Sequence, residues 1–233
     1  MRRPRRPRVP RWAQAISALL ALLAGTAASA AELRVEPVLA GKGRLPHVVI
    51  EGAIAPGDWS RFMKLLRAHP ELRGVALASD GGALDDGLAI ARQIHERGLD
   101  TTLLGNCHSV CAIMFLAGRE KFVPPRFQLS VHSAYRQLGS WTARDESAND
   151  TVTWFLGAMG YPLALARLWN DTAPEDVAYV TWTMNERWDL GFQRITPPAT
   201  VRAAGLAPWT ATPFPFRSPH AREFRNLHPA DIF

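Results

Sequence analysis

Cysteine is rare in this chain of 233 residues, which contains only Cys107 and Cys111. A framework of several disulfides is therefore excluded, and two cysteines with the neighbouring His108 do not complete a zinc site. We predict neither a metal nor an organic cofactor. In an oxidising compartment the two cysteines would bridge across one helical turn, although an i, i+4 pair is near the outer limit for an unstrained disulfide. The sequence leaves both the bridged and the reduced form open.

Acidic residues are absent before Glu32, whereas six arginines in this segment account for the whole net charge of +6. Beyond the segment the charges balance, which excludes the basic footprint of a nucleic-acid-binding protein. An apolar run over residues 13–24 follows the arginines, and Ala28 and Ala30 fit an A-x-A cleavage site. We interpret residues 1–30 as a secretory signal peptide and predict a periplasmic protein. The alternative is an uncleaved anchor over residues 12–31, which would keep the protein near a membrane.

A single α/β domain is expected over residues 31–196. Short apolar runs alternate with amphipathic segments at the spacing of parallel βαβ units, and 47% of the residues are hydrophobic. Strands are expected at 47–54, 74–79, 100–104, 121–123 and 128–134, and helices at 58–69, 84–96, 110–116, 141–158 and 163–169. Residues 31–44 are a lead-in of mixed character, and the TAPE sequence at 172–175 predicts a capping box that starts another helix. Residues 197–233, rich in proline and aromatic residues, predict a surface tail.

A serine occupies the corner of the stretch GNCHSVCAIMFLA, residues 105–117. The apolar residues before it predict a buried strand, Gly105 and Asn106 predict a turn, and residues 110–116 predict a buried helix. Ser109 would then lie at the helix N-terminus. Free N–H groups and the positive end of the helix dipole there stabilise an oxygen that develops negative charge. The alternative is that Ser109 only caps the helix.

Two further motifs accompany this serine. The SDGG sequence at 79–82 follows a buried strand, and its glycines let backbone N–H groups approach a ligand. The SVHS sequence at 130–133 places His132 in an apolar strand, where a histidine is either a hydrogen-bonded core residue or a base. The order strand, glycine pair, helix, strand, serine, helix, strand, histidine indicates a site more strongly than any single motif.

In that order, residues 75–134 resemble the Clp protease proteolytic subunit and the wider crotonase-like superfamily. The SDGG sequence matches the family's serine or asparagine followed by any residue and two glycines. Gly105 matches its glycine four residues before the nucleophile, and Pro124, Pro125 and His132 match its histidine strand after a proline-containing turn. The resemblance implies an α/β fold of the crotonase-like (ClpP-like) type, a spiral of βα units in a single domain.

The resemblance also implies roles for particular residues. Ser109 would be the nucleophile, His132 its general base, and the N–H groups of Gly82 and Val110 the oxyanion hole. The family has glycine where this chain has Cys111.

The third member of the implied triad is less well matched. The family's acid falls on Tyr179, so Asp176, one helical turn earlier, becomes the expected catalytic acid, with Asp171 as a weaker candidate. No lysine takes the place of a base on a later helix. The lysines of the chain are Lys42, Lys64 and Lys121.

These features predict a periplasmic serine hydrolase, a ClpP-like peptidase that acts on a peptide or protein substrate by acyl transfer. The resemblance implies a homo-oligomer, with the helix expected at 141–158 and the tail as contact surfaces. The alternative is a non-catalytic secreted scaffold or binding protein with a degenerate triad, which Tyr179 and the cysteines around Ser109 favour. A coenzyme A thioester enzyme would share the fold, but its cofactor is cytoplasmic and the export signal disfavours it.

Overall fold

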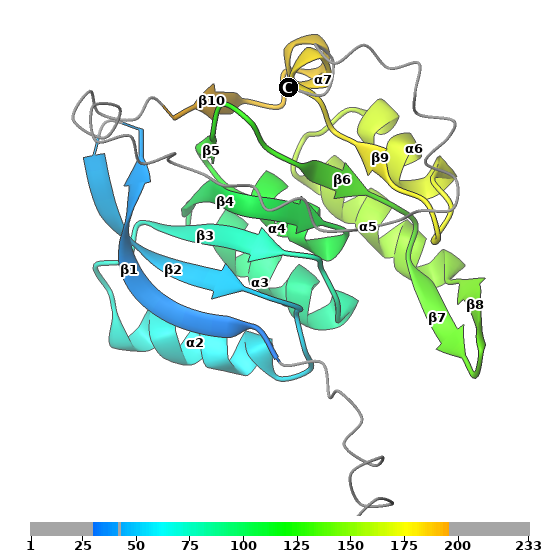
Figure 1. Cartoon of the computed structure of the whole chain (residues 1–233), viewed down its shortest axis with the longest axis horizontal. Helices are drawn as coiled ribbons and strands as arrows, with labels where there is room; N and C mark the ends of the chain where they lie inside the picture. Colours follow the sequence, from blue (N-terminus) through cyan, green and yellow to red (C-terminus); the bar gives the residue numbers. More distant parts are fainter. Residues whose placement is uncertain (1–29, 42, 196–233) are drawn as a thin grey trace, which may run out of the picture.

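The computed structural model describes residues 30–41 and 43–195, so all of the predicted signal peptide except Ala30, and the predicted tail at 197–233, lie outside the described residues. The described chain is an α/β fold with a mixed, mostly parallel sheet and six helices (Figure 1). The strands are β1 (Glu32–Ala40), β2 (Gly43–Glu51), β3 (Gly74–Ser79), β4 (Asp100–His108), β5 (Lys121–Val123), β6 (Leu129–Val131), β7 (Tyr135–Leu138), β8 (Trp141–Arg144), β9 (Ala178–Tyr179) and β10 (Phe192–Arg194). The helices are α2 (Asp58–Ala68), α3 (Leu84–Glu96), α4 (Val110–Leu116), α5 (Glu146–Ala158), α6 (Leu163–Asp171) and α7 (Trp182–Trp188).

Eight of the described strands form one sheet. Its order is β1-β2-β3-β4-β5-β10, and β6 pairs with both β4 and β9. The pairs β2–β3, β3–β4, β4–β5, β4–β6 and β5–β10 are parallel, whereas β1–β2 and β6–β9 are antiparallel. The parallel βα units expected from the apolar runs are therefore confirmed. The hairpin of β7 and β8 forms a separate small sheet that extends from the body of the fold (Figure 1).

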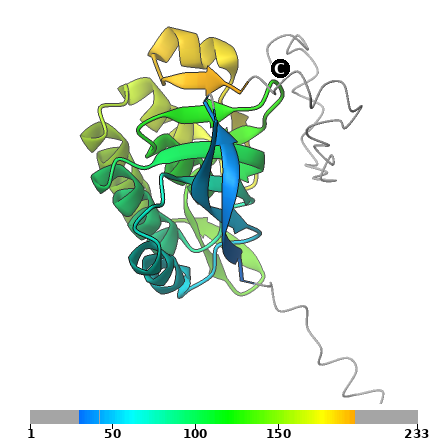
Figure 2. The same ribbon diagram turned by 90° about the vertical axis from the view of Figure 1, so that its left-hand side faces the viewer.

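Helices α2 to α6 gather on one side of the main sheet, and the orange α7 lies at its end near β10 (Figures 1 and 2). Among them α4 is buried along its entire length, from Val110 to Leu116, and it contacts α3, β3, β4 and β6. A seven-residue helix with no polar side chain is stable only when neighbouring elements cover it completely. The corner that carries Ser109 is thus joined directly to the centre of the core.

The mixed lead-in at residues 31–44, to which the sequence assigned no element, contains a strand, because Glu32–Ala40 form β1 along the whole length of β2. The strand was hidden by its charged residues and by Pro37, which interrupt the alternating pattern. Pro37 is tolerated because β1 is an edge strand, and Arg34 is held by Glu51 across the pair at 2.9 Å.

The helix expected at 141–158 begins later. Trp141–Arg144 form β8, which pairs with β7 through a turn at Gly139, whose φ is +65°. The carboxylate of Asp145 then accepts a hydrogen bond from the N–H of Ala148 at 3.2 Å, and this cap starts α5 at Glu146. A strand therefore occupies the first four residues of the predicted helix.

The helix expected to start at 172–175 does not form. The Thr172 hydroxyl donates to the carbonyl of Leu168 at 2.6 Å, at the end of α6. Residues 172–177 form bends and a turn instead, and the segment continues into β9.

Candidate active site

Ser109 lies on a one-residue corner between β4 and α4. Its backbone has φ 58° and ψ −129°, and it is one of two non-glycine residues with positive φ in the described chain. The N–H of Ser109 donates to the carbonyl of Ser130 at 3.0 Å, and the carbonyl of Ser109 accepts from the N–H of Ala112 at 2.9 Å. Backbone strain of this kind persists only where the surrounding structure holds it, and it is frequent at functional sites.

The strand before the corner is longer than expected. Gly105 and Asn106 belong to β4, which runs on to His108, so the turn predicted at these two residues is wrong. The register of β4 against β3 shifts between Leu77 and Ser79, so that the extra residues of β4 are accommodated within the sheet. The strand-to-helix change is therefore concentrated at Ser109.

The hydroxyl of Ser109 makes no capping hydrogen bond, although the residue occupies the N-cap position of α4. The structure therefore does not support the alternative that the Ser109 side chain serves only as a helix cap. A hydroxyl at a helix N-terminus that is not used in capping remains available for a reaction.

A disulfide joins Cys107 and Cys111 across the corner, with the two Cα atoms 5.2 Å apart. One cysteine belongs to β4 and the other to the first turn of α4, and both are fully buried. The bridge thus ties the end of the strand to the start of the helix on either side of Ser109.

Removing this disulfide is expected to lower the stability of the protein. A bridge over a sequence separation of four residues closes a small loop, for which the loss of chain entropy corresponds to about 2 kcal/mol. The free energy of unfolding in urea, measured for the oxidised and the reduced form of the same chain, should differ by about this amount. An unchanged unfolding midpoint after complete reduction would contradict this expectation.

The SDGG turn lies directly against the serine corner. The hydroxyl of Ser79 accepts a hydrogen bond from the N–H of Gly81 at 3.1 Å. A Cβ atom on Gly81 would come within 2.7 Å of the Cβ of Ser109. Glycine is therefore required here by the close approach of the two backbones.

Gly82 presents its backbone to the same region. The N–H of Ile54 donates to the carbonyl of Gly81 at 2.7 Å, and the N–H of Ala83 donates to the carbonyl of Ile54 at 2.8 Å. Neither bond uses the N–H of Gly82. The N–H of Val110 belongs to the first turn of α4, where the donors have no partner within the helix. Both predicted oxyanion donors are thus free of the secondary-structure bonds around them.

His132 follows β6 and faces the corner. Its Nδ1 lies 2.9 Å from the carbonyl oxygen of Ser133, and its ring stacks on that of Trp169 with 6.2 Å between centroids and 14° between planes. Burial lowers the pKa of His132 below its ordinary value of 6.5, while the bond to the Ser133 carbonyl acts in the opposite direction. The imidazole is therefore neutral at neutral pH, as a general base must be.

Ser109, His132 and Gly82 line one cavity of about 670 Å³. Apolar side chains, among them Leu84 and Trp169, form other parts of its lining, and Tyr135 and Gln137 contribute from the β7–β8 hairpin. No hydrogen bond joins Ser109 to His132 within the described chain. In unliganded enzymes such bonds are often long and tighten only when substrate binds.

None of the predicted acids meets the imidazole of His132. Asp176 lies in the turn before β9, where its Oδ1 is buried without a hydrogen-bond partner, and it does not line the cavity. Tyr179 lies in β9 opposite Ser130, where burial raises the pKa of its phenol. Asp171 is the exposed last residue of α6. The Nδ1 position that a triad acid would occupy is taken by a backbone carbonyl.

A second histidine, which we did not predict as a site residue, lies next to the serine. Nδ1 of His108 is 2.5 Å from the hydroxyl of Ser130, and Nε2 is 4.0 Å from a carboxylate oxygen of Asp80. Burial lowers the pKa of His108, Asp80 raises it, and the charge of His132 lowers it further. His108 does not line the cavity. The sequence could have indicated this histidine, because it lies directly before Ser109.

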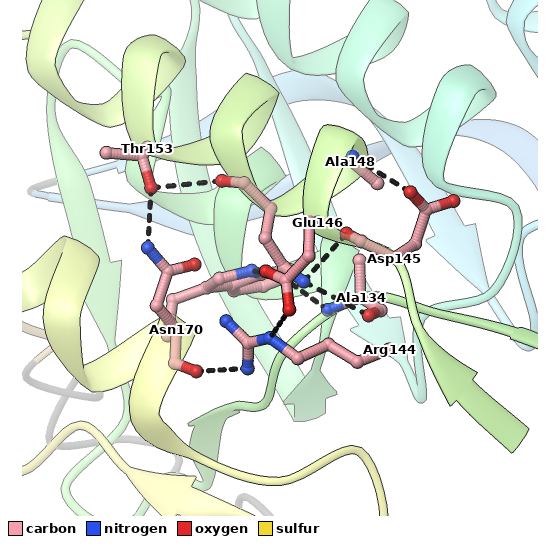
Figure 3. A network of polar contacts seen from close by, with 9 residues as sticks. Ala134, Arg144, Asp145, Glu146, Ala148, Thr153 and Asn170 are labelled. Atoms are coloured by element: carbon pink, nitrogen blue, oxygen red, sulfur yellow. Dashed lines mark hydrogen bonds and ion pairs between the residues drawn. The ribbon is translucent and has the colours of Figure 1, made fainter.

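A network of polar contacts surrounds Arg144, the last residue of β8 (Figure 3). The side chain of Arg144 contacts Glu146 and the carbonyl of Asn170, and the amide of Asn170 donates to Thr153 at 2.8 Å. These contacts join the base of the hairpin to α5 and α6.

Within residues 30–41 and 43–195, no group of three or more histidine, cysteine, aspartate or glutamate side chains is arranged to hold a metal ion. Neither a scan against models of protein families nor a search of curated proteins finds a match for this chain.

Proposed function

We propose that this protein is a serine hydrolase, most specifically a ClpP-like peptidase that acts by acyl transfer through Ser109. The observation that carries the proposal is the strained corner at Ser109, whose unused hydroxyl faces the same cavity as His132 and Gly82. The parallel βα units and the order of the three motifs support a crotonase-like fold. The disulfide and the predicted signal peptide support a periplasmic location.

The reaction follows from these positions. Nε2 of His132 takes the proton from Ser109 as Oγ bonds to the substrate carbonyl carbon. The N–H groups of Gly82 and Val110 stabilise the oxyanion that forms. The protonated imidazole then gives its proton to the leaving amine. Water next attacks the acyl-enzyme while His132 takes its proton, and His132 returns a proton to Ser109 as the acid product leaves.

Labelling with a fluorophosphonate probe tests the proposal. We expect the mature protein to react at Ser109, with the modified peptide identified by mass spectrometry, and Ser109→Ala to abolish the reaction. Ser147→Ala, which removes an exposed serine of α5, should label normally. Absence of labelling in a folded, oxidised protein would overturn the proposal and favour the binding or scaffold protein.

That second candidate has a specific observation in its favour, because no carboxylate of residues 30–41 or 43–195 contacts His132. A scaffold would retain the turns for structural reasons and would form homo-oligomers without acyl transfer. Among the described residues no helix is long and apolar enough to cross a membrane. The labelling result decides between acyl transfer and the scaffold, whereas the periplasmic location and the homo-oligomer are separate parts of the proposal.

The rate of labelling is expected to rise with pH along an acid limb centred below pH 6.5. Burial lowers the pKa of His132, and the imidazole accepts a proton from Ser109 only when it is itself unprotonated. The reaction should therefore reach its plateau by neutral pH and weaken as the pH falls through the lowered pKa. A stopped-flow pH profile of labelling checks this. An acid limb centred above pH 7 would contradict the assignment of a buried, neutral base.

Substrates with a cationic side chain are expected to react faster than acidic ones. Among the described residues, the lining of the cavity contains Asp85, Asp86 and Asp145 but no lysine or arginine. Asp86 binds backbone N–H groups of Gly57 and Trp59, and Asp145 pairs with Arg136, so Asp85 is the carboxylate left for substrate.

We expect lysyl esters to acylate Ser109 about three- to tenfold faster than glutamyl esters. Asp85→Asn should remove this preference. Asp150→Asn, which alters an exposed carboxylate of α5 away from the cavity, should keep it. Equal rates for both esters in the unaltered protein would contradict the expectation.

A further inference from the structure

We infer that the backbone carbonyl of Ser133 takes the place of the triad acid, and that Asn149 is the positioning residue that holds it. The inference rests on the proposed function, because it concerns how His132 is prepared to act as a base.

The hydrogen bond of His132 fixes its tautomer. Its Nδ1 lies 2.9 Å from the Ser133 carbonyl oxygen, and a carbonyl oxygen only accepts. Nδ1 therefore carries the proton and Nε2 keeps its lone pair, which is the form that a base for Ser109 needs. In a serine triad the carboxylate performs this task and also stabilises the imidazolium.

The carbonyl is itself held in place by Asn149. The peptide group between Ser133 and Ala134 is trans and planar, so its N–H and carbonyl point in opposite directions. The N–H of this peptide group belongs to Ala134 and donates to Oδ1 of Asn149 at 2.7 Å (Ala134 in Figure 3). In addition, Nδ2 of Asn149 donates to the carbonyl of Ala134 at 3.2 Å. Anchoring the N–H on one side directs the carbonyl towards His132 on the other.

Asn149 also holds the ring on which His132 stacks. The indole N–H of Trp169 donates to the same Oδ1 at 2.8 Å, and both side chains are about 1% exposed. The Nδ2 group donates further to the carbonyl of Asp145 at 2.8 Å, so the amide of Asn149 is fully bonded. One buried side chain thus determines both the hydrogen bond and the stacking partner of His132.

Asp176 takes no part in this arrangement. Its buried Oδ1 has no hydrogen-bond partner, and it lies outside the cavity lining. The carboxylate predicted as the catalytic acid therefore does not orient His132 in this geometry.

The tautomer of His132 can be measured without a substrate. In ¹⁵N-histidine-labelled protein above pH 7.5, the long-range ¹H–¹⁵N spectrum should show the Nδ1–H form, assigned by its loss in His132→Gln. The same form should persist in Asp176→Asn. An Nε2–H form in the unaltered protein, or loss of the Nδ1–H form in Asp176→Asn, would overturn the inference.

Asn149→Ala should reduce the rate constant of labelling by about 10- to 100-fold with little change in probe affinity, because the base is misplaced while the cavity remains. Trp169→Phe removes the indole N–H together with the five-membered ring that carries it, and serves where Asn149→Ala does not fold. Asn170→Ala, in the neighbouring part of the network, should label within about twofold of the unaltered protein, as expected of a side chain without contact to His132.

A loss of about 10⁴-fold in Asp176→Asn would show that this carboxylate is the triad acid and overturn the inference. Normal labelling in both Asn149→Ala and Trp169→Phe would overturn it as well. A protein that shows the Nδ1–H form but never labels would separate the two proposals, because the orientation of His132 would stand while the hydrolase assignment failed.

Discussion

Acylation of Ser109 is expected to slow by about 10²–10⁴-fold when His132 is replaced by glutamine, which is the usual contribution of general acid–base catalysis. Glutamine keeps a polar side chain of similar length, but its amide does not accept a proton near neutral pH. The serine would then attack with its proton still bound. The pseudo-first-order rate of fluorophosphonate labelling, measured at neutral pH, gives the size of the loss, and the acid limb of the pH profile should disappear with it.

His108→Gln is the matched control for this substitution. His108 is also partly buried and also adjoins Ser109, but its ring bonds to Ser130 and it does not line the cavity. We expect labelling of this variant to stay within about fivefold of the unaltered rate, since no base is removed. A larger loss in His108→Gln than in His132→Gln would mean that the two histidines have been assigned the wrong roles.

Gly82→Ala is expected to reduce acylation by about 10²–10³-fold, the cost of losing one oxyanion donor. The backbone of Gly82 has φ +134°, and a Cβ atom would lie 2.2 Å from the carbonyl oxygen of Ile54. The turn must shift to relieve this clash, and the N–H of Gly82 shifts with it. The melting temperature should fall too, because the bonds between Ile54 and the two residues flanking Gly82 hold the turn to the end of β2.

Gly139→Ala is the control that tests positive φ alone, without the steric clash that a Cβ on Gly82 makes with Ile54. Gly139 also has positive φ, +65°, but no atom lies within 4 Å of the position that its Cβ would take. This variant should lose about 1 kcal/mol of stability and label at the normal rate. Equal loss of labelling in both glycine variants would indicate that the hairpin turn, and not the oxyanion donor, controls the reaction.

The parallel βα units could be predicted because their residues carry the information locally. The run GVALAS is apolar without alternation, as a strand covered on both faces should be, and it forms β3. The edge strand β1 and the hairpin strand β8 were missed for the opposite reason. Both depend on a partner strand, and their exposed residues, such as Glu36 and Trp141, show little periodicity.

The residues of the candidate site could be predicted in part. Ser109, His132 and Gly82 belong to short motifs, and the structure brings all of them to one cavity. The partner of the imidazole could not be predicted, because a backbone carbonyl has no residue type to recognise. Asn149 was equally hidden, since its role depends on the fold that brings α5 beside the segment after β6.

The two walls of the cavity belong to parts of the molecule with very different local stability. Ser109 continues directly into α4, in which every residue is buried, so its amide protons should exchange with solvent only when the whole domain unfolds. Tyr135 and Gln137 belong to a hairpin whose strands pair only with each other. That wall should open through local fluctuations of much lower free energy. We therefore expect a ligand to enter beside the hairpin and to meet a serine that hardly moves.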